Sequence, residues 1–150
     1  MGFRLSMSLK PTDYDFGVPE NYAFASDITC ADEKARQMFV LGYGHMLNYN
    51  HEEAIACFVK CTEMDPNCAM AWWGIAYCVS SNYNWAPGLG SGYDAIQQGL
   101  AVMGHCTELE KDLITALSTR HTKEARDSAD PSVLNTVSYT HLRAHETVSD

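Results

Sequence analysis

The chain has 150 residues, a net charge of −9 and a hydrophobic fraction of 46%. This length suits one domain with a real core, and the hydrophobic fraction argues against a disordered chain. The acidic balance argues against nucleic acid or an anionic membrane as partner, because both require a basic patch. No run of the sequence reaches the roughly 18 apolar residues of a membrane-spanning helix. We therefore expect no nucleic-acid partner and no membrane partner.

The first ten residues, MGFRLSMSLK, lack the long apolar run and small-residue cleavage site of a signal peptide. We therefore expect a cytoplasmic protein with reduced cysteines that are buried as small hydrophobic side chains. No two cysteines form a C-x-x-C pair. The six cysteines are Cys30, Cys57, Cys61, Cys68, Cys78 and Cys106.

The first predicted segment, residues 1–30, is turn-rich and aromatic. Pro11, Gly17 and Pro19 prevent one continuous helix there, so we expect irregular backbone. From Ala31 onward, apolar residues recur at spacings of three and four, which predicts a first helix as far as about residue 49. Acidic residues at its start favour the positive end of the helix dipole.

Two further helices are predicted between residues 50 and 81. Asn50 and Glu53 have the spacing of a capping box, which predicts the start of the second helix. Asp65 is predicted to cap the third helix, with Pro66 at the first helical position, where its missing N–H costs nothing. This helix should end between Tyr77 and Ser81.

A Gly-rich loop, SSNYNWAPGLGSG, separates the third helix from two more. Residues 92–104 are predicted as the fourth helix, and residues 107–120 as the fifth. Thr107 and Glu110 again have capping-box spacing. Residues 122–136 are polar, which is typical of a linker or of the start of another repeat.

Repeated helix–turn–helix units call for a search for internal periodicity. Leu41, Gly42, Ala54, Phe58 and Pro66 fit the W-x₂-L-G-x₂-Y…A-x₃-F…P pattern, whose period is about 34 residues. The chain thus resembles the tetratricopeptide repeat (TPR) family. The resemblance implies an all-α fold over residues 31–121, a TPR-like stack of antiparallel helix hairpins forming an α-solenoid fragment of about two to two and a half repeats.

The C-terminal end has a different character. Residues 137–147, VSYTHLRAHET, resemble the translation of a sequencing-library adaptor. We therefore expect residues 137–150 to be a non-native tail on an N-terminal fragment of a longer multi-repeat protein. His141 and His145, which have metal-binding spacing on a helix, are set aside for this reason.

Other residues could carry chemistry, but each has a simpler structural explanation. His51, Cys57 and Cys61 lie on one predicted helix, yet Cys61 takes the small core position of the repeat, and structural zinc needs four ligands. Glu52 and Glu53 diverge by about 100° on a helix and cannot form a carboxylate pair. No nucleophile, base and orienting group can be assembled. We expect no enzyme activity, no metal and no cofactor.

Function is then expected on the surface that the stacked hairpins present. The TPR resemblance implies a concave groove, and its positions are largely apolar here. We therefore expect a non-catalytic scaffold that binds a protein or peptide segment by apolar burial. The groove residues are expected to be Arg36, Phe39, Tyr43, Met46, Leu47, Met70, Trp73 and Tyr77.

Two alternatives remain open at this level. An apolar groove of this size rarely stays uncovered in a monomer, so later repeats or aromatic residues of the N-terminal segment could fill it. The aromatic residues in question are Tyr14, Phe16, Tyr22 and Phe24. The chain could also be a helical wall or lid domain of a metal- or ligand-binding enzyme.

Overall fold

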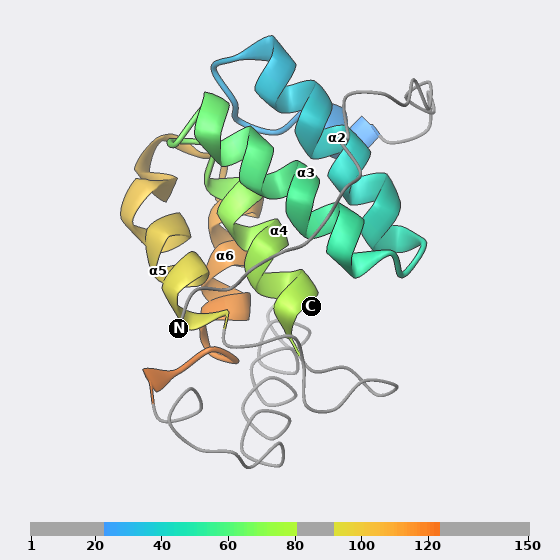
Figure 1. The fold of residues 1–150 in the computed structure, drawn as a ribbon. Coiled ribbons are helices and arrows are strands. Elements are labelled where there is room, and N and C mark those ends of the chain that lie inside the picture. The colour runs from blue at the N-terminus through green and yellow to red at the C-terminus, as the bar shows by residue number, and fades with distance from the viewer. Residues whose placement is uncertain (1–22, 81–91, 124–150) are drawn as a thin grey trace, which may run out of the picture.

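The computed structural model describes residues 23–80 and 92–123, and the regular structure in these ranges is helical (Figure 1). The predicted all-α class is therefore confirmed for the described part of the chain. Within it, no helix has both the length and the apolar character needed to cross a bilayer. The elements are α1 (Ala23–Ser26), α2 (Glu33–Leu47), α3 (His51–Met64), α4 (Ala69–Val79), α5 (Tyr93–Val102), the 3₁₀ turn η2 (Met103–His105) and α6 (Glu108–Ser118).

Helix α4 lies at the centre of the described fold. It contacts α3 and α5, its neighbours in the chain, and also α2 and α6 (Figure 1). This position explains its composition. A helix enclosed on several sides is apolar around most of its circumference, and seven of its eleven residues are buried.

Several predictions fall outside the described residues. These are the irregular backbone of residues 1–22, most of the Gly-rich loop, most of the polar segment 122–136 and the tail 137–150. Helix α1 lies within the predicted irregular segment 1–30 and is a single turn.

The helix starts differ in part from their predicted caps. The capping box of α6 is confirmed, because the Thr107 and Glu110 side chains each bond the other's backbone N–H. Asn50 is the N-cap of α3, as predicted, but the predicted capping box does not form, since the Asn50 side chain makes no capping hydrogen bond. Tyr49 reverses the chain at a φ of 61°, and the Asn50 N–H instead bonds the His45 carbonyl at 2.9 Å.

The predicted start of the third helix is also wrong. Helix α4 begins at Ala69 with Cys68 as its N-cap, so Pro66 lies in the preceding turn. The Asp65 carboxylate instead accepts hydrogen bonds from the Asn67 N–H at 3.1 Å and the Ala31 N–H at 2.8 Å. The first bond closes a local turn, and the second ties this turn to the segment before α2.

Phe58 of α3 fills the space between α2 and α4. Its side chain has no exposed surface and packs against Phe39, with the ring centroids 5.3 Å apart. Gly42 of α2 and Gly74 of α4 face the same ring. A Cβ atom at Gly42 would come within 2.9 Å of the Phe58 ring, and one at Gly74 within 2.6 Å. The two glycines therefore permit the close approach of three helices.

Replacing Gly74 by Ala should overpack this junction. We expect Gly74→Ala to lower the free energy of unfolding by about 1–2 kcal/mol, because the clash exceeds the gain in helix propensity. Chemical denaturation followed by circular dichroism measures the change. Gly104→Ala is the matched control, since a Cβ there meets nothing within 4 Å. Equal stability of the two variants would contradict this role for Gly74.

Glu110 joins the two ends of the described fold. Its side chain, in α6, is only 2% exposed. It accepts hydrogen bonds from the Thr29 N–H at 2.7 Å and the Thr29 hydroxyl at 2.6 Å. Burial disfavours the charged carboxylate, but the hydrogen bonds from Thr29 and Thr107 outweigh it and hold the pKa of Glu110 below its ordinary value.

Glu110→Gln should weaken this connection, because its amide NH₂ would face groups that now donate to a carboxylate. We expect a loss of about 2 kcal/mol in the free energy of unfolding near neutral pH. The folded-state pKa is lowered, so the wild-type advantage is present above the ordinary carboxyl pKa and is lost as the pH falls below it. Urea unfolding at several pH values tests both points. A difference between the two proteins that stays constant into acid would contradict the ionised pairing.

Candidate functional site

Half of the predicted groove residues lie in the core. Phe39 and Met70 have no exposed surface, while Met46 is 6% and Trp73 is 8% exposed. Their side chains are therefore not available to a partner in this structure, which corrects the expectation of an open groove along these positions. The reason is tertiary, because α2 and α4 are both covered by α3, whose Phe58 takes the space between them.

Arg36 and Tyr43 are half-buried and already have partners. The Arg36 guanidinium donates to the Cys30 carbonyl at 2.6 Å and pairs with Glu33 at 2.9 Å. The ring of Tyr43 packs on Phe24 at a centroid distance of 5.7 Å. The Phe24 contact favours the alternative in which the N-terminal segment covers part of the groove. The other three aromatic residues of that alternative lie outside the described residues.

Leu47 and Tyr77 remain exposed, and they come together at one place. They line a hollow of about 220 Å³ that is formed where α2 and α4 end. Leu47 is 48% and Tyr77 is 42% exposed. Of the predicted groove, the exposed residues Leu47 and Tyr77 thus belong to one concave site. The residues lining the hollow are Met46, Leu47, Tyr49, His51, Tyr77, Ser80 and Arg120.

Aromatic rings give the hollow two firm walls. Tyr49 and His51 stack with their centroids 6.1 Å apart and an interplanar angle of 13°. On the other wall Tyr77 packs against the buried Trp73, at a centroid distance of 5.3 Å. Rigid rings lose little conformational entropy when they bind a ligand, so this surface suits an apolar side chain. The sequence did not single out Tyr49, His51 or Arg120 for this site.

Beside the hollow, Ser80 forms a buried polar contact with His121. The Ser80 hydroxyl lies 2.8 Å from the Ala76 carbonyl, and its oxygen forms a hydrogen bond of 2.7 Å with His121 Nε2. Gly92 leaves the space for the imidazole, because a Cβ there would lie 2.6 Å from the ring. Burial, together with the nearby charge of Arg120, lowers the pKa of His121 to about 4.

The buried histidine predicts a pH-dependent stability. Its pKa is depressed in the folded state, so its contribution is complete above the unfolded pKa of 6.5 and is lost as the pH falls toward 4. We expect the free energy of unfolding to fall by about 2 kcal/mol between about pH 7.5 and pH 5. Denaturation of the wild type and of His121→Gln across this range tests it. If the free energy of unfolding changed equally with pH in both proteins, His121 would not be the source of the pH dependence.

A second cluster lies at the other end of α4. The Sγ atoms of Cys30, Cys61 and Cys68 all lie within 4.8 Å of one another, and all three side chains are buried. They come from the segment before α2, from α3 and from the N-cap of α4. Cys106 is also close enough to Cys68 for the two thiols to interact electrostatically, but its Sγ lies outside this set.

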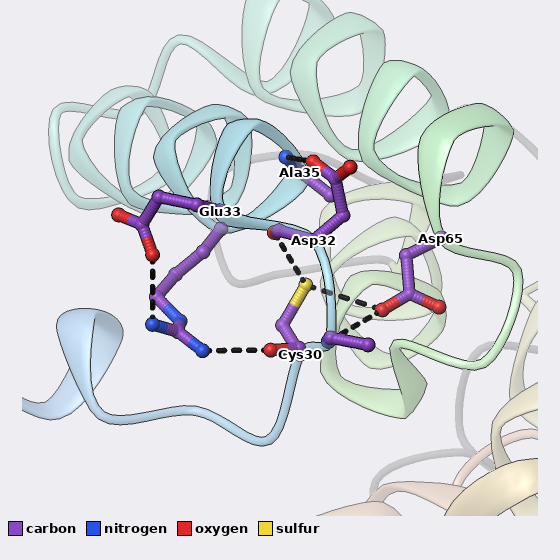
Figure 2. Close-up of polar contacts among 7 residues, drawn as sticks. Cys30, Asp32, Glu33, Ala35 and Asp65 are labelled. Carbon is purple, nitrogen blue, oxygen red and sulfur yellow. Dashed lines mark hydrogen bonds and ion pairs between the residues drawn. The ribbon is translucent and has the colours of Figure 1, made fainter.

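Hydrogen bonds hold the Cys30 side of the cluster. Figure 2 shows the Cys30 thiol between the Asp32 carbonyl and the Asp65 carboxylate, each 3.4 Å from Sγ. Burial and the nearby Cys68 raise the pKa of Cys30 to about 12. The pKa of Cys68 is also raised, first by its hydrogen bond with Cys61 and then by burial. The Cys30 and Cys68 thiols therefore carry protons at neutral pH.

The sequence pointed to a different set of cysteines. The sequence analysis considered His51, Cys57 and Cys61 as possible metal ligands because they lie on one predicted helix. In the structure, His51 and Cys57 are not part of the cluster. Cys30 and Cys68 join Cys61 only through the packing of three segments. The spacing of these cysteines matches no metal-binding motif, so no sequence signal could have found them.

Comparisons of the chain with protein-family models, with curated proteins and with solved structures find no match.

Proposed function

We propose that this chain is a non-catalytic protein-interaction scaffold with a TPR-like arrangement of helix hairpins. The observation that carries this proposal is the aromatic-walled hollow between Leu47 and Tyr77. It is the place where exposed apolar side chains of two helices converge on a concave surface. Concave, largely apolar sites with a few polar groups are where proteins bind ligand side chains.

The order of helix contacts supports the TPR-like part of the proposal. In such a stack, the first helices of successive hairpins contact each other while each also packs on its own partner. Helix α2 contacts α4 and α4 contacts α6, in addition to the contacts between chain neighbours. Gly42 and Phe58, two residues on which the resemblance depends, touch across the α2–α3 pair.

Binding at the hollow would proceed by shape and burial, without a covalent step. An aliphatic or aromatic side chain of an extended partner segment enters between the Tyr49–His51 stack and Tyr77. The bound side chain then covers Leu47, and the free energy gained by removing this apolar surface from water drives the association. Arg120, which also lines the hollow, supplies a charged group that orients the partner's backbone.

Selection of a displayed random-peptide library on the full chain tests the proposal. Peptides with a shared apolar anchor should be enriched, and their affinity is then measured by fluorescence polarisation. Because hot-spot residues contribute more than about 1 kcal/mol, Leu47→Ser and Tyr77→Ala should each weaken binding about tenfold. Both residues are exposed, so the variants should retain the wild-type circular dichroism spectrum.

Leu109→Ser is the matched control, since Leu109 is 58% exposed on α6 and does not line the hollow. It should leave peptide affinity unchanged. Equal losses from Leu47→Ser and Leu109→Ser would refute binding at the hollow, as would a library that yields no enriched anchor. Trp73 is unsuitable for this test, because truncating a buried tryptophan lowers stability by about 3–5 kcal/mol.

A further inference from the structure

We propose that Cys30, Cys61 and Cys68 form a buried three-thiolate site for a soft monovalent metal ion, Cu(I). The proposal is independent of the peptide-binding hollow, which lies at the opposite end of α4. The site would join the segment before α2, helix α3 and the start of α4 through one ion.

The geometry is close to that of a trigonal metal–sulfur site. Metal–sulfur bonds of about 2.3 Å in a trigonal plane place the sulfur atoms about 4 Å apart. The three Sγ atoms already lie within 4.8 Å of one another. Small side-chain rotations would therefore complete the site, without a change in the packing of the helices.

The ligand set favours Cu(I) over other common metals. Thiolates select soft ions such as Cu(I) and Zn²⁺ over Mg²⁺ or Ca²⁺. Zinc in structural sites is almost always bound by four ligands. Here Asp65 Oδ2 is 3.4 Å from Cys30 Sγ, but neither Asp65 nor Cys106 belongs to the set within 4.8 Å. Cys61 and Cys68 have no exposed surface, so water has no ready access as a fourth ligand.

Asp65 already forms hydrogen bonds with backbone amides, so it is not available as a metal ligand. Its carboxylate accepts from the Ala31 and Asn67 amides, and these bonds hold the turn before α4. Moving it onto a metal would break bonds on which the local backbone depends. The structure therefore offers three sulfur ligands rather than four, and the Cys30–Asp65 hydrogen bond is given up when Cys30 loses its proton.

Binding is an exchange of protons for a metal ion, with no change in oxidation state. Three S–H bonds lose their protons to solvent, and three metal–sulfur bonds form, which leaves a complex of charge −2. The positive end of α4, whose N-cap is Cys68, favours this negative charge. The Arg36 guanidinium, bonded to the Cys30 carbonyl, lies near the same side. Cys30, at 7% exposed, is the ligand nearest to solvent.

The test is anaerobic titration of the reduced full chain with Cu(I) held by a colorimetric chelator. The wild type should withdraw one equivalent, and the bound ion should raise the melting temperature, because only the folded chain holds the three thiols together and therefore binds the ion more tightly than the unfolded chain does. Cys68→Ala should weaken Cu(I) binding more than about 100-fold, beyond the 10- to 100-fold effect of losing an outer-shell partner. Cys30→Ser should weaken Cu(I) binding by the same factor. Because Cys30 lies nearer the surface, this variant replaces Cys68→Ala in the test if Cys68→Ala folds poorly.

The chain provides its own matched controls. Cys78→Ala removes a thiol that is equally buried but lies outside the cluster, and it should leave Cu(I) affinity unchanged. Cys106→Ala should also leave it unchanged, because a three-coordinate site does not use this neighbour. All the variants retain every histidine of the chain, so a difference between them reports on the thiols.

Several outcomes would overturn the proposal. Equal Cu(I) affinity in Cys68→Ala and Cys78→Ala would remove the cluster as the site. Tight Zn²⁺ binding that is lost in Cys106→Ala or in a folded Asp65→Asn would show a four-ligand zinc site instead. A disulfide within the cluster, found by mass spectrometry in protein that withdraws no Cu(I), would assign it to thiol oxidation.

Discussion

Phe58 sets how closely the three central helices approach one another. Its ring is fully buried, packs on Phe39, and lies against two positions without side chains, Gly42 of α2 and Gly74 of α4. Because protein interiors are packed at near-crystalline density, a ring held on two sides leaves little freedom in helix position. Both candidate sites lie at the ends of helices that this ring positions.

The hollow and the cysteine cluster lie at opposite ends of α4 and differ in chemistry. The hollow has exposed apolar and aromatic walls, with a buried Ser80–His121 contact beside it. The cluster is enclosed, the pKa values of Cys30 and Cys68 are raised, and the Cys30 thiol lies 3.4 Å from the Asp65 carboxylate. A surface of the first kind suits a side chain from another protein, while the second suits a small ion. A metal at the cluster would stabilise the same helix whose other end borders the hollow.

The sequence predicted the secondary structure well where the pattern was local. Helical spacing of apolar residues located the helices, and the Thr107–Glu110 pair correctly marked the start of α6. The errors concern polar residues with several possible partners. Asp65 was expected to cap a helix, yet its carboxylate also bonds the Ala31 amide, from a segment that is distant in the sequence. Such a competing partner is invisible to a local pattern, because only the fold brings it near.

The sequence by itself determined the all-α class and the approximate helix bounds, since both follow from the periodicity of apolar residues. Only the tertiary structure decided which apolar residues are accessible. Phe39 and Leu47 occupy the same helix and both fitted the predicted groove, but α3 covers one and leaves the other at the hollow. Only the tertiary structure brought Cys30 to Cys61 and Cys68, because their proximity depends on chain segments that no repeat pattern relates. Burial and long-range proximity depend on how helices pack, and packing is a property of the whole chain.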